Sequence, residues 1–290
     1  MARFLNFIFR RREERYGGYE LIAEVARGGM SRIWKVRHPE SGRIYAMKVL
    51  TAESVELVDL FRRVFEAEEG DIALRLDHPN VVKTYEYGHG RADEYYIVME
   101  YVDGPNLATL IALESPRVRD SRFDLVMQIA EGLRYIHEKG LIHRDFCPKN
   151  VLCTDEGVAK IIDFGLTIPA SVKARTVLAR AGTASYMAPE QIRSQAVDER
   201  ADIYAFGVSA FEILAGRRPF PRSADRGRRM LDILNVDPLR LREVEPELSE
   251  PLEAVIQKCI AKDRLLRYKS MGEVIRDMGP ALEAAGQPGH

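Results

Sequence analysis

Two patterns of apolar and polar residues follow one another along the chain, and the change lies near residue 103. Before that point, short runs rich in β-formers predict strands separated by turns. These runs are Tyr19–Val25, Arg32–Arg37, Arg43–Leu50, Val81–Gly88 and Tyr95–Tyr101. Between them, a segment from about Val55 to Leu76 has apolar residues at helical spacing and predicts one helix.

After residue 103, longer stretches with an apolar side predict amphipathic helices. They are Ser121–Lys139, Ala201–Ala215, Leu252–Ala261 and Ser270–Met278. A small, mostly antiparallel sheet with one helix, followed by a larger helical region, is an α+β arrangement with two lobes. We divide the chain into an extension at 1–18, a small N-terminal lobe at 19–102, a larger C-terminal lobe at 103–280 and a tail at 281–290. Ligand sites often lie between such lobes.

Charge and cysteine content limit the partners and the cellular location that we expect. The 43 basic residues almost balance the 44 acidic ones, which argues against a nucleic-acid partner. The three cysteines are odd in number and lack metal-ligand spacing, which favours a reducing, cytoplasmic location. No run of about 18 apolar residues predicts a membrane span. Residues 1–15 combine apolar side chains with arginines. They either dock on a membrane surface or on a partner protein, or pack against the neighbouring lobe.

Five short motifs carry the candidate chemistry. The strongest is the run from His143-Arg144-Asp145 to Asn150, followed by Asp163-Phe164-Gly165 and Ala188-Pro189-Glu190. Upstream lie Ala46-Met47-Lys48 in a predicted strand and a glycine-containing turn at 26–31. In this order and spacing the motifs resemble the protein kinase family over roughly residues 19–279, with most similarity to bacterial eukaryotic-like serine/threonine kinases.

The resemblance implies a two-lobed kinase fold, one catalytic domain, and ATP with Mg²⁺ as cofactors, with Mn²⁺ as a substitute. Asp145 would orient the acceptor hydroxyl and accept its proton. Asn150 and Asp163 would bind the metal through oxygen atoms, the ligands that Mg²⁺ prefers. Lys48 would contact the α- and β-phosphates and pair with an acidic residue of the following helix. Spacing selects Glu69 for that role, with Glu66 in reserve and Glu68 a third candidate.

The resemblance also assigns the adenine pocket. Met99 would lie at its back, and the backbones of Glu100 and Val102 would bond the adenine edge. Apolar residues on both sides would sandwich the ring, and glycines would approach the phosphates: Val25, Ile33, Ala46 and Leu152, with Gly28 and Gly29. Without a ligand, the same segment would be a buried edge strand.

Further assignments concern the scaffold and its regulation. Asp202 would anchor the catalytic loop, and Glu190 would pair with Arg267. Arg144 is typical of kinases controlled by activation-loop phosphorylation, which we predict at Thr176. Thr183 would support Asp145 and shape the acceptor site.

Two departures separate this sequence from the family pattern. Ala26 and Ser31 replace the first and third loop glycines, which predicts weakened nucleotide affinity. Cys147 stands where serine/threonine kinases usually have lysine, and Lys149 is either a compensating phosphate contact or a surface lysine. Cys147 itself is either an inert small side chain or a thiol with a lowered pKa and sensitivity to oxidation.

We therefore expect a kinase that phosphorylates serine or threonine in protein substrates, including its own activation loop. The thinned loop and Cys147 motivate one alternative, a pseudokinase that acts as a nucleotide-responsive binding module. A phosphotransferase acting on a small molecule is a third hypothesis, which the acceptor-loop motif around Glu190 disfavours.

Overall fold

The computed structural model describes residues 15–28, 31–50, 69–89, 95–171 and 182–286. The chain divides into two compact units. The small unit holds Lys83–Val102 and the chain up to Arg75; the large unit holds Leu76–Val82 and the chain from Asp103 onward. In the described ranges no helix has the length and apolar character that crossing a bilayer demands.

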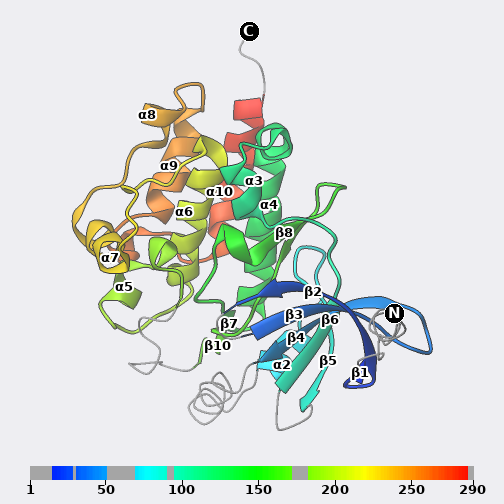
Figure 1. The fold of residues 1–290 in the computed structure, drawn as a ribbon. Helices are drawn as coiled ribbons and strands as arrows, with labels where there is room; N and C mark the ends of the chain where they lie inside the picture. The colour runs from blue at the N-terminus through cyan, green and yellow to red at the C-terminus, as the bar shows by residue number, and fades with distance from the viewer. Residues whose placement is uncertain (1–14, 29–30, 51–68, 90–94, 172–181, 287–290) are drawn as a thin grey trace, which may run out of the picture. The chain divides into compact units, whose positions relative to one another are not determined.

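The small unit is built on one six-stranded sheet in the order β1-β2-β3-β4-β6-β5, and every neighbouring pair is antiparallel (Figure 1). Its strands are β1 (Arg15–Tyr16), β2 (Tyr19–Arg27), β3 (Ser31–Arg37), β4 (Ile44–Leu50), β5 (Thr84–His89) and β6 (Tyr95–Glu100). Its helix is described only at α2 (Glu69–Leu74); the rest of the predicted Val55–Leu76 helix lies outside the described residues. The predicted α+β class is confirmed.

One strand prediction began too early. The apolar pair Val81-Val82 belongs to the large unit, where Val81 forms a parallel bridge with Ile161 and the Val82 N–H donates to the Ile161 carbonyl at 2.9 Å. The strand β5 therefore starts at Thr84. The apolar residues alone did not show whether this segment extends a strand of the small unit or forms a bridge within the large unit.

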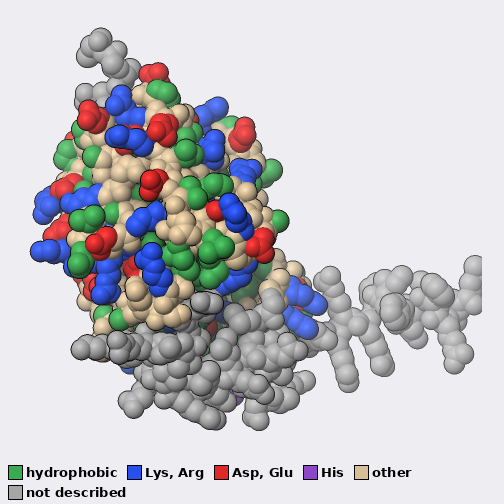
Figure 2. Space-filling view, turned by 90° about the vertical axis from the view of Figure 1, so that its left-hand side faces the viewer, with side chains coloured by type: hydrophobic (Ala, Val, Ile, Leu, Met, Phe, Trp, Pro, Cys, Tyr) green, Lys and Arg blue, Asp and Glu red, His purple; other side chains and the backbone are tan. Residues whose placement is uncertain are grey.

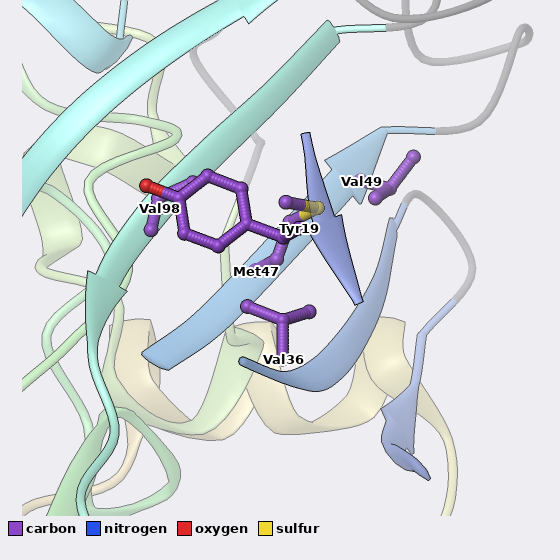
Figure 3. Packing of buried hydrophobic residues seen from close by; sticks show 5 residues of the cluster. All are labelled: Tyr19, Val36, Met47, Val49 and Val98. Atoms are coloured by element: carbon purple, nitrogen blue, oxygen red, sulfur yellow. The ribbon is translucent and has the colours of Figure 1, made fainter. Parts of the chain in front are cut away.

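The sheet has two different faces because successive strand residues point to opposite sides. One face holds the core cluster of Figure 3, in which Met47 and Val49 of β4 pack with residues of three other strands: Tyr19, Val36 and Val98. The intervening residues Ala46, Lys48 and Leu50 lie on the other face. Lys48 is thus a charged residue whose neighbours along the strand, Met47 and Val49, are apolar and buried.

The large unit is mainly helical. Its helices are α3 (Leu107–Ala112), α4 (Pro116–Glu138), α5 (Pro189–Ile192), α6 (Arg200–Ala215), α7 (Arg226–Asn235), α8 (Leu241–Val244), α9 (Glu250–Cys259) and α10 (Met271–Gly286). Two small antiparallel sheets of two strands each accompany them, β7 (Leu141–Ile142) with β10 (Ile168–Pro169) and the hairpin of β8 (Val151–Cys153) with β9 (Ala159–Ile161). On the face shown in Figure 2, basic, acidic and apolar side chains are interspersed.

Helix α6 lies at the centre of this unit and packs against α4 and α9. Its residues are buried almost all round, from Ala201 to Leu214, so it lacks a polar stripe and reads as a core helix. It ends at Gly216, whose left-handed backbone (φ 66°) suits glycine at a helix C-terminus. This burial matters for function because α6 carries Asp202.

Helix α4 begins earlier than the pattern predicted. It starts at Pro116, which fits the first helical turn, and bends at Ser121, where the prediction began. The Ser121 hydroxyl donates to the Arg117 carbonyl at 2.5 Å. A side chain that bonds a carbonyl four residues back commonly bends a helix, so the local hydroxyl explains the kink.

Candidate active site

A buried ion pair joins the sheet of the small unit to α2. Lys48 Nζ lies 2.7 Å from Glu69 Oε1, and both side chains are about nine-tenths buried. The apolar face around Lys48 explains the pairing, since a buried charge without a partner is strongly disfavoured. Glu69 is therefore the described partner of Lys48, whereas Glu66 and Glu68 lie outside the described residues.

Gly70, which the sequence analysis did not single out, lets α2 approach the sheet closely. A Cβ there would lie 2.2 Å from the Tyr87 ring and 2.4 Å from the Tyr95 hydroxyl. The Gly70 N–H also donates to that hydroxyl at 3.0 Å. Because Gly70 directly follows Glu69 in α2, this close approach to the sheet sets the position from which Glu69 reaches Lys48.

The predicted adenine residues divide between the units. Val25, Ile33, Ala46, Met99, Glu100 and Val102 belong to the small unit, and Leu152 lies in β8 of the large unit. Ala46 pairs with Met99 across β4 and β6, so both lie at one register position of the sheet. The Glu100 N–H donates to the Lys83 carbonyl at 2.8 Å, so a backbone contact of Glu100 with adenine would use its carbonyl oxygen.

The turn after β2 is partly described. The Gly28 N–H donates to the Ser31 carbonyl at 2.8 Å, which closes the turn between β2 and β3. Val25 is 47% exposed, an unusual exposure for a large apolar residue in a strand. Gly29 lies outside the described residues, so its predicted approach to phosphate stays a prediction.

In the large unit, Asp202 anchors the chain that leads into the catalytic loop. Its carboxylate accepts backbone N–H bonds from His143 at 2.7 Å and Arg144 at 2.8 Å, and it bonds His137 Nε2 at 2.9 Å. Burial by itself would raise the pKa of Asp202, but these hydrogen bonds outweigh it and hold the pKa below its ordinary value. An ionised, fully buried carboxylate thus fixes the backbone just before Asp145.

His137 and Gln191 complete this support and were not predicted. Gln191 donates its side-chain amide to the Arg144 carbonyl at 2.9 Å. Arg144 has a left-handed backbone (φ 67°), which costs a residue with a side chain of the order of 1–3 kcal/mol. The bonds from Asp202 and Gln191 on both sides of Arg144 hold that conformation. No sequence pattern marked these two residues, because their partners are distant in sequence.

Asp145 lies at the centre of the candidate site. The Thr183 backbone N–H donates to its Oδ1 at 2.6 Å, and the Asn150 side-chain amide donates to its backbone carbonyl at 2.9 Å. Burial raises the pKa of Asp145, and the bonds from Thr183 partly oppose that rise. The loop therefore holds a half-buried, oriented carboxylate with an elevated pKa, a suitable general base.

A short hairpin brings Asn150 and Asp163 together. Asn150 precedes β8 and Asp163 follows β9 by two residues, and the register pairs Val151 with Ile161. The Ile162 N–H donates to the Asn150 carbonyl at 2.9 Å. Because antiparallel strands place their outer ends side by side, two oxygen-bearing side chains lie at one end of the hairpin. Oxygen donors of this kind suit a magnesium ion.

Cys147 and Lys149 occupy different environments. Burial raises the pKa of the Cys147 thiol to about 11, and its Sγ lies 3.7 Å from Thr183 Oγ1. The hypothesis of a lowered thiol pKa is therefore wrong, and Cys147 is a small buried side chain. Lys149 is exposed on the turn η3 (Pro148–Asn150), one residue before Asn150.

Glu190 and Arg267 form a buried bidentate pair. Arg267 Nη1 lies 2.7 Å from Glu190 Oε1, and Nη2 lies 2.9 Å from Oε2. The other guanidinium N–H groups donate to the carbonyls of Ala261, Arg200 and Lys262. All five donors of the side chain are thus used, which only arginine can do.

The regulatory residues are described only in part. Arg144 is buried, and burial lowers its pKa. Thr183 contacts both Asp145 and Cys147, as given above. Thr176 and residues 1–14 lie outside the described residues, so phosphorylation and docking there stay predictions.

Comparison with known proteins agrees with this geometry. The model of the protein kinase domain matches residues 19–277, and the chain belongs to the protein kinase family. It is similar to the serine/threonine-protein kinase PknJ of Mycobacterium tuberculosis (34% identity, 94% of this chain, 47% of PknJ). It is also similar to PrkC of Bacillus subtilis (31% identity, 92% of this chain, 41% of PrkC). The chain spans less than half the length of these relatives.

Proposed function

We propose that this chain transfers the γ-phosphoryl group of ATP to serine or threonine hydroxyls of proteins. The observation that carries the proposal is the arrangement around Asp145, with its backbone anchored by Asp202 and with Asn150 and Asp163 at the end of one hairpin. The relatives' names, all serine/threonine-protein kinases, support the acceptor class.

Each residue has a role in the proposed reaction. Asp145 orients the acceptor hydroxyl and takes its proton as the new phosphorus–oxygen bond forms and the bond to ADP breaks. Asn150 and Asp163 would hold Mg²⁺, which neutralises phosphate charge when bound. Lys48, fixed by Glu69, would contact the α- and β-phosphates. Lys149 would supply the γ-phosphate contact that Cys147 cannot make.

The proposal extends to regulation and location. Autophosphorylation at Thr176 rests on the resemblance and on the buried Arg144. A cytoplasmic location rests on the three cysteines, which are free and buried: Cys147, Cys153 and Cys259. Docking through residues 1–15 rests on their composition alone.

The test is phosphate transfer from labelled ATP with Mg²⁺, followed by phosphoamino-acid analysis. The wild type should label serine or threonine, and Asp145→Asn and Asp163→Asn should each lose roughly 10²–10⁴-fold in rate. Asp155→Asn is the matched control, because Asp155 is 86% exposed in the turn between β8 and β9. ATP binding without transfer by the wild type would instead establish the pseudokinase.

A further inference from the structure

A short segment of the large unit concentrates positive charge. Between Arg217 and Arg229 there are six arginines and one acidic residue, Asp225. The chain as a whole has 43 basic and 44 acidic residues, so this surplus is a local feature and not a consequence of composition. We call residues 217–229 the arginine segment.

The arginine segment lies beside the candidate acceptor site. Its helix α7 packs against the 3-10 turn η4 (Ala184–Tyr186). Arg226 Nη1 donates to the Gly182 carbonyl at 3.2 Å. A Cβ on Gly182 would lie 3.1 Å from Asp145 Oδ1, so the same residue touches the proposed base on one side and the arginine segment on the other. Three extended residues span about 10 Å, enough to reach from one to the other.

Internal partners neutralise only part of the charge. Arg228 pairs with Asp232 at 2.9 Å, and Arg218 lies 3.8 Å from Glu212 and over the Tyr186 ring. Arg217 and Arg222 are exposed, and Arg222 interacts electrostatically with Glu212, as Arg218 does. The folded segment therefore keeps a positive surplus on its surface.

A small hollow of about 10 Å³, the size of one water molecule, lies in the same part of the surface. Its lining combines an apolar floor with polar and basic side chains: Ser185, Arg218, Phe220, Pro221, Arg229 and Ile233. Within the described part of the chain, Arg229 Nε is buried without a hydrogen-bond partner. The same guanidinium is held in place through its Nη1, which donates to the Ser223 and Ala224 carbonyls at 2.8 and 2.9 Å.

We propose that the arginine segment selects acidic acceptor peptides, with Asp or Glu within about three residues of the phosphorylated hydroxyl. This inference rests on the proposed function and names its substrate class. Arg217 and Arg222 supply the exposed charge for the carboxylates. The chain's own activation loop is basic around Thr176, with Lys173, Arg175 and Arg180. Its autophosphorylation would then depend on high local concentration and not on matched charge.

The experiment compares peptides with one threonine acceptor. Three residues on either side of that threonine are replaced, one side at a time, by Glu, Gln or Lys. We expect the wild type to prefer a Glu peptide over its Gln counterpart by roughly 10-fold in kcat/KM, on one side of the threonine. The preference should shrink as salt rises from 0.05 to 0.5 M, because screening shortens the range of exposed charges.

Charge reversal locates the preference. The double variant Arg217→Glu with Arg222→Glu should lower kcat/KM for the Glu peptide by roughly 10-fold. It should change kcat/KM for the Gln peptide by less than about 2-fold and raise kcat/KM for the Lys peptide. The milder pair Arg217→Gln and Arg222→Gln should abolish the preference without inverting it. Arg119→Glu is the control, since Arg119 is 74% exposed on a different helix, α4.

The outcomes separate the two proposals. Transfer to all three peptide types at equal rates, or an equal effect of Arg119→Glu, would overturn the acidic selection and leave the kinase proposal standing. Transfer to no peptide and no protein would overturn both.

Discussion

Removing Arg267 tests the reasoning about the scaffold most directly, because all five of its donors are used and its side chain is fully buried. The change Arg267→Met keeps the length of an unbranched chain but leaves the buried carboxyl group of Glu190 without its partner. Breaking one side of a buried pair in this way costs about 3–5 kcal/mol. The three carbonyls that lose a donor add to the cost.

The second half of the cycle isolates the ion pair. Glu190→Met removes the carboxylate, and the double variant removes both charges, so it should be less destabilised than the two single losses added together. We expect a coupling of about 2–3 kcal/mol between the two positions. Arg117→Met is the matched control: Arg117 meets Asp155 at 2.8 Å, almost the same distance, but that pair is exposed and should contribute less than about 1 kcal/mol.

Urea unfolding measured with two probes makes the assay specific. The single tryptophan, Trp34, lies in β3 and reports on the small unit, whereas far-UV circular dichroism is dominated by the helices of the large unit. With a urea slope of about 2 kcal/mol per molar, the dichroism midpoint of Arg267→Met should fall by about 1.5–2.5 M. The fluorescence midpoint should fall less.

A shift below about 0.5 M, or one equal to that of Arg117→Met, would refute the claim that burial makes this pair essential. Strict additivity in the double variant would show that Glu190 gains nothing from the guanidinium. Equal shifts in both probes would mean that the two units unfold together, and would remove the assignment of the effect to the large unit.

Two further predictions follow from the active site. Gly70→Ala should lower the free energy of unfolding by about 1–3 kcal/mol and slow phosphate transfer, because the added methyl group displaces Glu69 from Lys48. Gly272→Ala is the control: a Cβ there makes only an ordinary contact at 3.7 Å, so neither the unfolding free energy nor the rate should change. Full activity of Gly70→Ala would contradict the role of the close approach. Since Asp145 must be ionised to act as a base and its pKa is raised, kcat should fall as pH drops through a pKa above the usual value of about 3.9. Thr183→Val keeps the backbone N–H but removes the side-chain hydroxyl, whose hydrogen bond also lowers this pKa. It should therefore move the acid limb of the pH–rate profile to higher pH; an unmoved limb would sink the assignment.

The sequence alone determined the fold class and named the residues of the candidate site. Strand and helix patterns on the two sides of residue 103 gave the α+β class, because a period of two and a period near 3.6 are properties of local sequence. The motif residues Lys48, Asp145, Asn150 and Asp163 could be named because each lies in a short local motif through which the sequence resembles the protein kinase family.

Only the tertiary structure decided how distant residues meet. Glu69 met Lys48 because Gly70 lets α2 approach the sheet, and Asp202 acquired an ionised state because His137 and two backbone N–H groups surround it. The Cys147 pKa rose because the thiol is buried, which its sequence neighbours did not reveal. Close approach, burial and hydrogen-bond partners depend on residues far apart in the chain, so no local pattern encodes them.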